Sequence, residues 1–517
     1  MYRIAPVLVA LVVVLSLGRF LEAAAPMATD TAVVQANSDF AFDLYGQLAK
    51  ENQGKNLFFS PFSMSSALTM VAEGALGKTA DQMGKVLRFP AAARAHGDEA
   101  QSLPWNLAAI HAGMAALSEQ CSSQKTTPQA MRDKIATLRK QLDAANTAAK
   151  AAHDWQQRNT LAQKAQKLAD ELNKLLAQVD QYELRVANAL WGEKTYPFRQ
   201  SYLQTIAKSY RTGGVFDVDF RTNFEAARLQ INSWVEEQTQ QRIKDLVPNG
   251  AVDEQTRLVL TNAIYFKGEW SEIFDAQATK TEDFTLAGGE KRRVPLMHKG
   301  GMEGARYAAF QGDGKYFDTP MMCAPERTDE KTLYPNAQGF AMLELPYKGE
   351  ELSMLVILPQ SAAGLTALEP RLTAENLRAW VGKLQKRHVN VFLPRFKLET
   401  SYEVSKSLQA MGMVQAFKNP SLPDGADFGG MSESSDPRDK LYISAVLHKA
   451  FVEVNEKGTE AAAATAVAMA AGAAMPVMVP FTPTFRADKP FVFLIRHKKT
   501  GSILFLGRMM NLDESGA

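Results

Sequence analysis

Apolar residues at helical spacing characterise the chain between residues 36 and 90. The segment NSDFAFDLYGQLAKE places Asn37 and Ser38, which are favoured helix caps, before its apolar positions. The next segment, SPFSMSSALTMVAEGALG, begins with Ser and Pro and ends with Gly, as helices commonly do. The pattern therefore predicts two helices here, the first beginning at the Asn-Ser pair.

A charge-rich zone with heptad repeats of apolar residues follows. One series of alternating four- and three-residue steps runs through residues 131–152, and another runs through residues 161–179. The apolar phase shifts between them, across residues 153–160. We interpret residues 120–181 as an inserted α-helical coiled-coil hairpin with its turn at this shift. One long helix with a stutter is the alternative.

From residue 182 onward, strand-like runs alternate with helical segments. Residues 224–250, FEAARLQINSWVEEQTQQRIKDLVPNG, predict an amphipathic helix closed by its final Pro, Asn and Gly. Residues 311–338 are rich in Gly, Pro and Asp, and their length indicates an inserted loop. The strand-like runs are YELRVANALW, TRLVLTNAIYFKGEW, FAMLELPYK, LSMLVILP, HVNVFLPRFKL and FVFLIRHKKTGSILFLGRMM. Together these elements predict an α+β fold.

The most unusual stretch is residues 456–480, EKGTEAAAATAVAMAAGAAMPVMVP. One interpretation is an Ala-rich helix, because Ala has the highest helix propensity. With a period of two, however, its only interior charge, Glu460, falls on one face and the other face carries small or apolar residues. Such a strand can enter between two existing strands without overpacking, and Gly458 before it supplies a permissive hinge.

Composition and charge fit an ordinary globular protein. The 517 residues are 46% hydrophobic and 22% charged, and 58 Lys and Arg against 56 Asp and Glu leave a net charge of +2. This balance does not favour a nucleic-acid partner. The two cysteines, Cys121 and Cys323, exclude a disulfide framework and a multi-cysteine metal site, and leave open whether they pair with each other.

Motifs for catalysis and cofactor binding are missing from the sequence. It contains no G-x-S-x-G, H-E-x-x-H, P-loop or G-x-G-x-x-G pattern, and its seven histidines show no pairing at a spacing of four residues. We therefore expect a protein that is not an enzyme, with no catalytic residues, no metal and no cofactor.

The N-terminus has the pattern of a signal peptide. Arg3 precedes an apolar run of 13 residues at positions 5–17, and small residues follow at positions 23–25. Residues 1–25 are therefore predicted to be a signal peptide of a protein that is secreted or extracytoplasmic, in the extracellular space or a periplasm. We expect no stable membrane contact after cleavage; retention of the segment as an N-terminal anchor is the alternative.

The segment VEVNEKGTEAAAATAV at 452–467 resembles the hinge of the reactive centre loop of serpins, the serine protease inhibitor family. The resemblance implies a serpin domain at 36–514, with three β-sheets, about nine helices and an exposed reactive centre loop at 456–480. Other resembling blocks, in order, are NLFFSPFSMSSALTMVAEGA, RVANALWGEKTYPF, LTNAIYFKGEW, VPLMHKGG, LPYKGEELSMLVILP, LPRFKLETSYEV and ADKPFVFLIRHKKTGSILFLGRM.

The resemblance implies inhibition of a serine-type endopeptidase by a suicide-substrate mechanism. The target protease cleaves the loop, and the loop then inserts into the main β-sheet. The partner would be a serine or cysteine protease, and the chain would be a monomer. The alternative is a non-inhibitory serpin that acts as a carrier, a chaperone or an interaction scaffold through residues 120–181, where a protein partner is possible. Small hinge residues favour inhibition.

Site residues follow from the same resemblance, motif by motif. The hinge comprises Glu456, Lys457, Gly458, Thr459, Glu460, Ala461 and Ala462. A polar shutter beneath the opening strands comprises Ser60, Ser63, Asn262 and His448. The breach, where the loop first enters the sheet, comprises Lys267 and Trp270; core packing is the alternative role of this tryptophan.

The scissile bond is placed less narrowly than the hinge. Family spacing from the hinge points to Gly472–Ala473, whereas counting back from FRADKPF points to positions as late as 478 or 479. No Lys or Arg lies between Lys457 and Arg486, which argues against trypsin-like targets. The candidate bait residues suit elastase-, subtilisin- or chymotrypsin-like proteases, or papain-like cysteine proteases; they are Gly472, Ala473, Ala474 and Met475.

Overall fold

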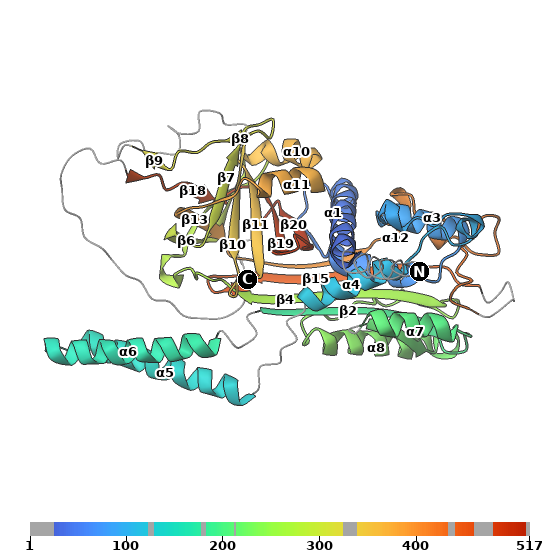
Figure 1. The fold of residues 1–517 in the computed structure, drawn as a ribbon, viewed down its shortest axis with the longest axis horizontal. Coiled ribbons are helices and arrows are strands. Elements are labelled where there is room, and N and C mark those ends of the chain that lie inside the picture. The colour runs from blue at the N-terminus through green and yellow to red at the C-terminus, as the bar shows by residue number, and fades with distance from the viewer. Residues whose placement is uncertain are drawn as a thin grey trace, which may run out of the picture.

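A computed structural model describes residues 25–121, 129–152, 154–176, 182–210, 213–323, 339–432, 440–459 and 479–512. Three large β-sheets and one two-stranded pair form within these residues, together with eleven α-helices (Figure 1). Two of the eleven helices lie inside the region 120–181, and a third ends at residue 121. The three-sheet α+β fold predicted from the sequence is thereby confirmed.

The six-stranded sheet carries the candidate site. Its central pair, β4 (Leu258–Glu269) and β15 (Ala445–Val454), runs parallel, with Ala445 opposite Val259 and Phe451 opposite Tyr265. One face of β4 packs into the main core, and helix α8 (Phe220–Gln238) covers the other face. The remaining strands are β14 (Phe396–Glu403) beside β15, β2 (Tyr182–Glu193) and β3 (Gly213–Val218) beyond β4, and β16 (Gly458–Thr459), which pairs with β4.

The other two large sheets form the rest of the body. In the eight-stranded sheet, central strands such as β11 and β19 are buried at every position, because both faces are covered. Its strands are β1 (Leu57–Phe59), β20 (Ile503–Met509), β19 (Phe491–His497), β11 (Leu352–Pro359), β10 (Phe340–Pro346), β7 (Arg306–Phe310), β12 (Gln385–Lys386) and β8 (Tyr316–Phe317). The four-stranded sheet contains β18 (Thr484–Arg486), β13 (Val389–Pro394), β6 (Lys291–Met302) and β5 (Lys280–Thr285).

Helices pack around these sheets. Helix α2 (Pro61–Ala72) has Pro at its first position, and the side chain of its N-cap Ser60 accepts a hydrogen bond from the N–H of Ser63. Besides α2 and α8, the helices outside the insert are α1 (Ala25–Glu51), α3 (Gly77–Val86), α4 (Ala108–Cys121), α7 (Gln200–Ser209), α10 (Leu365–Leu368), α11 (Ala374–Val381) and α12 (Ser405–Ala410).

Two helix boundaries differ from the sequence prediction. Helix α1 begins at Ala25 and continues through the expected cap, because Asn37 Nδ2 donates to the carbonyl of Ile503 at 3.1 Å in β20 instead of capping. Helix α8 ends at Gln238, well before the predicted end near 250. The backbone turns away at Gln240 and Gln241, both with positive φ.

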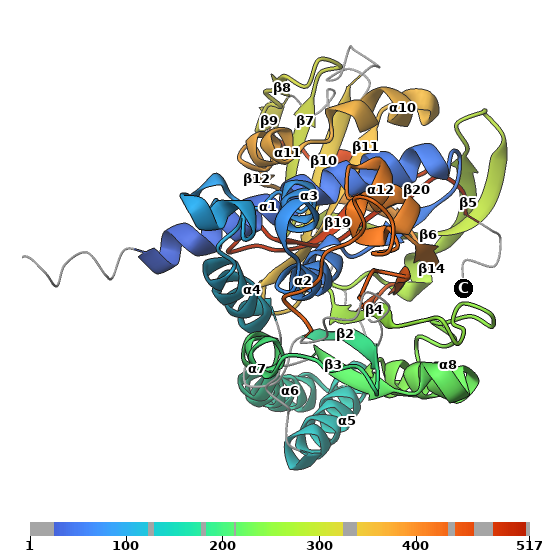
Figure 2. The same cartoon turned by 90° about the vertical axis from the view of Figure 1, so that its right-hand side faces the viewer.

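The inserted region contains two helices, α5 (Gln129–Ala151) and α6 (Trp155–Leu176). Their shared seam is apolar, and Lys134 forms an ion pair with Glu171 across it at 3.1 Å. The two helices α5 and α6 lie beyond the face of the six-stranded sheet that α8 covers, as Figures 1 and 2 show. Seam residues include Ile135, Leu138 and Leu172. A coiled coil in the strict sense remains a prediction.

The turn between α5 and α6 is shorter than predicted. It lies around residues 152–154 and not across 153–160, since α6 already begins at Trp155. Asp154 caps α6, with its carboxylate accepting from the N–H of Gln157 at 2.8 Å. The guanidinium of Arg158 donates to the carbonyl of Ala152 at 2.8 Å and closes the end of α5.

The loop at 311–338 contributes two short strands. Strand β8 extends the eight-stranded sheet, and β9 (Met322–Cys323) pairs antiparallel with β17 (Val479–Pro480). Cys121 and Cys323 are both buried free thiols, so they do not pair with each other. Among the described residues, no helix is long and apolar enough to cross a membrane.

Candidate functional site

A row of polar side chains crosses the six-stranded sheet at its centre. Backbone pairing places His448 of β15 opposite Asn262 of β4, and places Asn262 opposite Asn188 of β2. Asn262 is hydrogen-bonded to both neighbours, through Oδ1 to His448 Nδ1 and through Nδ2 to Asn188 Oδ1. Tyr402 of β14 extends the row on the other side of His448. The row therefore bridges the seam between β15 and β4.

Helix α2 supplies two hydroxyls beneath this row. Ser63 Oγ accepts from Asn262 Nδ2 at 2.7 Å and donates to Asn188 Oδ1 at 2.9 Å. Ser60 donates its N–H to His448 Nε2 at 3.1 Å and its hydroxyl to the carbonyl of Leu504 at 2.6 Å. The structure thus brings together all four residues that the sequence grouped as a shutter, in a fully buried network.

The hydrogen bonds determine the protonation of His448. Its Nε2 accepts from a backbone N–H, so Nδ1 carries the proton and donates to Asn262 Oδ1. Complete burial disfavours the imidazolium and lowers the pKa of His448 to about 3, against a weaker opposing effect of the Asn262 backbone. The imidazole is therefore neutral at physiological pH, and every ring nitrogen has a partner.

A tight turn connects β15 to β16, at the start of the predicted reactive loop. Asn455 and Gly458 exchange backbone hydrogen bonds of 2.8 and 3.1 Å around Glu456 and Lys457. Gly458 has φ +127°, and a Cβ there would lie 2.3 Å from the carbonyl oxygen of Gly268. Only glycine permits this close approach, which allows β16 to lie directly against β4.

Trp270 closes the same end of the sheet. Its ring stacks on Tyr347 with centroids 4.7 Å apart, and its Nε1 donates to the carbonyl of Asn455 at 3.0 Å. Its backbone N–H donates to the carbonyl of Lys457 at 2.8 Å. Core packing and contact with the hinge are therefore combined in one residue. Lys267 lies on β4 opposite Glu183, three residues before Trp270.

Glu456 is held by two side chains. Its carboxylate forms an ion pair with Arg395 and accepts from Thr279 Oγ1 at 2.7 Å. Burial acts to raise the pKa of Glu456, but these hydrogen bonds outweigh it, so the pKa lies below its ordinary value. Its carbonyl accepts from the N–H of Phe274 at 2.7 Å. The first hinge residue is thus fixed to the body of the molecule.

Sequence reasoning missed three members of this site: Asn188, Tyr402 and Arg395. The available signal was weak, namely a polar residue in the middle of an otherwise apolar strand, as in YELRVANALW. The remaining hinge residues and the bait candidates lie outside the described residues; they are Glu460, Ala461, Ala462, Gly472, Ala473, Ala474 and Met475.

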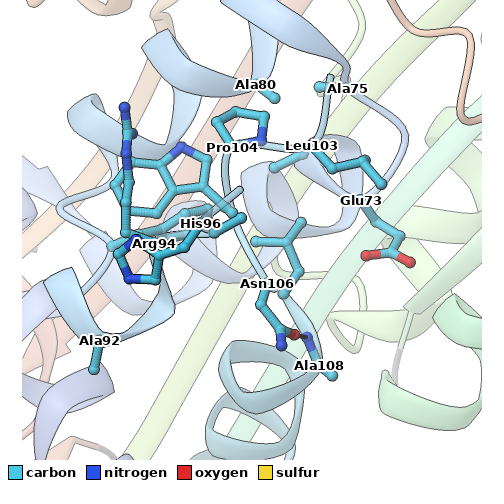
Figure 3. A pocket seen from close by; sticks show the side chains of 15 residues that line it. Glu73, Ala75, Ala80, Ala92, Arg94, His96, Leu103, Pro104, Asn106 and Ala108 are labelled. Atoms are coloured by element: carbon cyan, nitrogen blue, oxygen red, sulfur yellow. Dashed lines mark hydrogen bonds between the residues drawn. The ribbon is translucent and has the colours of Figure 1, made fainter. Parts of the chain in front are cut away.

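A cavity of about 600 Å³ lies elsewhere, between the end of α2, α3 and the start of α4 (Figure 3). Its lining includes Glu73, Arg94 and Trp105, and it contains none of the predicted site residues. Glu73 is paired with His111 at 2.9 Å, and Arg94 lies over the ring of Trp105 at 4.5 Å. Within the described residues, no cluster of His, Cys, Asp and Glu is arranged to hold a metal ion.

Comparison with known families gives one match that spans nearly the whole chain. The model described as "Serpin (serine protease inhibitor)" matches residues 35–152 and 136–512. Serpin B3 of Homo sapiens is 37% identical over 482 residues, covering 92% of this chain and 98% of that protein. A leukocyte elastase inhibitor of Xenopus laevis is 36% identical over 477 residues, covering 92% and 97%.

Solved structures give the same picture of the fold. Uncleaved ovalbumin has a TM-score of 0.65 and 27% identity, covering 93% of this chain and 100% of that one. Human thyroxine-binding globulin in complex with thyroxine has a TM-score of 0.66 and 26% identity, covering 94% and 100%.

One expectation from the sequence needs correction, and another stays a prediction. The expectation that the chain is not an enzyme was drawn from missing motifs, and missing motifs do not support such a conclusion. The comparisons give instead a positive finding, which is similarity to named protease inhibitors. Secretion through a signal peptide stays a prediction: the family match begins at residue 35, after the predicted segment, and the comparisons do not support secretion. Residues 1–24 lie outside the described residues.

Proposed function

The chain belongs to the serpin family, and from this premise we propose that it inhibits serine-type endopeptidases as a suicide substrate. A protease would cleave the reactive loop at 456–480, and the loop would then insert as a new strand between β15 and β4. Small or apolar bait residues suit elastase-, subtilisin- or chymotrypsin-like proteases, or papain-like cysteine proteases.

The observation that carries this proposal is the pairing of β16 with β4. Gly458 lies opposite Glu269 and Thr459 opposite Gly268, antiparallel, immediately after the turn from β15. Each further residue along the loop would move one residue back along β4. Continued insertion in this register would pair residues 460–469 with residues 267–258, the full remaining length of the strand.

This register gives the two faces of the loop different surroundings. Positions 461, 463, 465, 467 and 469 would lie opposite β4 residues whose side chains belong to the main core or to the polar row. Thr465 would lie opposite Asn262, where its hydroxyl can replace the bond that His448 gives up. Glu460 would lie opposite Lys267, so the one charge meets a charge of opposite sign.

Insertion would exchange one strand ladder for two. The parallel pairing of β15 with β4 is lost, and the new strand pairs with both. The net gain is roughly one ladder of a dozen hydrogen bonds, on the order of 10 kcal/mol at ~1 kcal/mol each. A gain of this size is comparable to the whole stability of a typical domain, so the uncleaved state can be folded and metastable.

The test is complex formation with a panel of proteases. The purified protein is incubated with elastase, subtilisin, chymotrypsin and papain, and the products are separated on denaturing gels. SDS-resistant complexes with a serine protease support inhibition, and mass spectrometry of the released C-terminal peptide locates the scissile bond. Clean cleavage with full protease activity remaining would instead favour a carrier, chaperone or scaffold role.

Export by residues 1–25 and a monomeric state are further proposals. The support is the apolar run at positions 5–17 followed by small residues at 23–25. N-terminal sequencing of the protein recovered outside the cytoplasm tests export, and an intact N-terminus on the cytoplasmic side would contradict it. Light scattering of the purified protein tests the monomer.

A further inference from the structure

Residues 320–323, in the loop predicted at 311–338, contact the C-terminal end of the predicted reactive loop. Strand β9 pairs antiparallel with β17, with Val479 opposite Cys323 and Pro480 opposite Met322. The N–H of Phe481 donates to the carbonyl of Met321 at 3.0 Å and extends the pairing by one residue. We call residues 320–323 and 479–481 the clip. It joins the C-terminal side of the reactive loop to the body of the molecule.

The sequence of the clip is compatible with this pairing. Hydrogen-bonded and non-hydrogen-bonded pairs alternate in an antiparallel ladder, and the Phe481–Met321 pair is hydrogen-bonded. Pro480 therefore occupies a non-hydrogen-bonded position, where its missing N–H costs nothing. A proline one position either way, at 479 or 481, would break the ladder.

A buried arginine connects both halves of the clip to the body. Arg387 is 6% exposed, and its guanidinium donates to the carbonyl of Pro320. The same guanidinium lies 5.8 Å from the ring centroid of Phe481, which is 3% exposed. The backbone N–H of Arg387 donates to the carbonyl of Ala305 at 3.2 Å. A rigid anchor therefore lies beneath the clip.

The outer side of the clip is apolar and exposed. Met321 is 57% exposed and Met322 is 43% exposed, and they are the two adjacent members of the small set of exposed large hydrophobic residues in the described chain. Adjacent exposed apolar side chains indicate a contact surface more than scattered ones do, and methionine adapts to irregular partner surfaces.

We propose that the clip is an exosite that contacts the target protease beside its reactive centre, on the C-terminal side of the scissile bond. This inference rests on the proposed inhibitory function. Between the last bait candidate, Met475, and Val479 an extended chain covers about 13 Å, and from Gly472 about 23 Å. A small domain is about 30 Å across, so a protease positioned on the scissile bond reaches Met321 and Met322.

The partner is thus a protease with an apolar surface next to the subsites that hold the residues after the cleaved bond. The clip fixes where the chain leaves the reactive loop, and the two methionines cover that surface. Because the contact forms on docking, it accelerates association and leaves loop insertion, which follows cleavage, unchanged.

The test compares the double variant Met321→Asp/Met322→Asp with Leu422→Asp, a matched control. Leu422 is 58% exposed and belongs to a segment whose Asp424 pairs with Lys78 of α3, which lies at the opposite end of the molecule from β9 in Figure 1. The assay uses the panel protease that the unaltered chain inhibits fastest. We expect the association rate constant to fall about tenfold in the double variant and to change less than about twofold in the control.

The stoichiometry of inhibition and the melting temperature should stay unchanged in both variants. An unchanged association rate in the double variant would overturn the exosite. A shift of the unaltered protein, but not of the double variant, towards a dimer on gel filtration would also overturn it, since a second copy would then cover the methionines. If the unaltered chain forms no complex with any protease, the proposed function itself fails, which is a distinguishable result.

Discussion

Two rows of side chains cross the two largest sheets, and they join neighbouring strands by different forces. In the eight-stranded sheet, one leucine from each of β11, β19 and β20 stands in a single row, each fully buried: Leu355, Leu494 and Leu506. In the six-stranded sheet, the central row is polar and consists of His448, Asn262 and Asn188.

The difference concerns what happens when strands separate. A leucine row is stabilised by packing. Separating its strands exposes apolar surface to water, which costs about 25 cal/mol of free energy per Å². A polar row is stabilised by hydrogen bonds, whose partners can be exchanged for those of an arriving strand at little net cost. The first row therefore fits a permanent junction, whereas the second fits a seam that opens and closes again around a new strand.

The largest expected effect comes from preventing the seam from accepting the loop. In the proposed register, Thr459→Arg places a charge opposite Gly268, on the side of the main core. Burying an unpaired charge costs several kcal/mol, so insertion slows and the stoichiometry of inhibition rises by more than about tenfold. Titration of protease activity measures it, with Thr459→Ser as control. Unchanged complex formation would contradict insertion of this segment.

Removing one member from each row separates packing from hydrogen bonding. Leu494→Ala should lower the free energy of unfolding by about 2–5 kcal/mol through a cavity. Asn262→Ala removes the acceptor of His448 Nδ1 and the donor to Ser63 Oγ, and should cost about 2–4 kcal/mol. Denaturant unfolding before and after loop cleavage measures both. The leucine variant should lose the same stability in the uncleaved and the cleaved form, whereas the asparagine variant should lose less in the cleaved form. If the asparagine variant lost the same stability in both forms, the exchange of partners would be contradicted.

A pH effect of intermediate size should belong to the polar row. The folded pKa of His448, about 3, lies below its unfolded value, so the unfolded chain binds the extra proton and stability falls as pH falls. Between about pH 7 and about pH 5 this residue should account for a loss of about 2 kcal/mol. The measurement is the difference in pH slope between the unaltered chain and His448→Asn. Parallel slopes would show that the histidine does not titrate on unfolding.

The smallest expected effect lies at the hinge. Glu456→Gln removes the ion pair with Arg395, whose side chain is 40% exposed, so solvent screening limits the loss to about 1 kcal/mol or less. The hydrogen bond to Thr279 can persist in the amide. Thermal unfolding at several salt concentrations measures the change, and salt should reduce the difference from the unaltered chain. A loss that does not depend on salt would contradict a mainly ionic role.

Local features of the fold could be predicted from the sequence to the extent that their causes are local. The strand β4 and the start of α2 at Ser60 follow from periodicity and capping. The start of α1 was predicted wrongly because Asn37 bonds to a carbonyl 466 positions away in the chain instead of capping. The turn before α6 was misplaced because an alternative cap, Asp154, decided its position.

The candidate site divides in the same way. Resemblance predicted the hinge at 456–462 and the group of Ser60, Ser63, Asn262 and His448; the structure brings that group together, and the hinge stays a prediction. Asn188 and Tyr402 could not, because one polar residue inside an apolar strand does not reveal which residue will lie opposite it. The pairing of β9 with β17 joins two segments more than 150 positions apart, and neither has a pattern that requires the other.

The sequence by itself determined which segments form most of the strands and helices, and it predicted that the stretch of small residues after Gly458 can enter a sheet. Only the tertiary structure decided that Asn188, Asn262 and His448 form one row, and that Met322–Cys323 pair with Val479–Pro480. The physical reason is that propensity and periodicity act between near neighbours in the chain. Strand register and hydrogen-bond partners are decided only when distant segments compete for the same backbone groups and the same buried space.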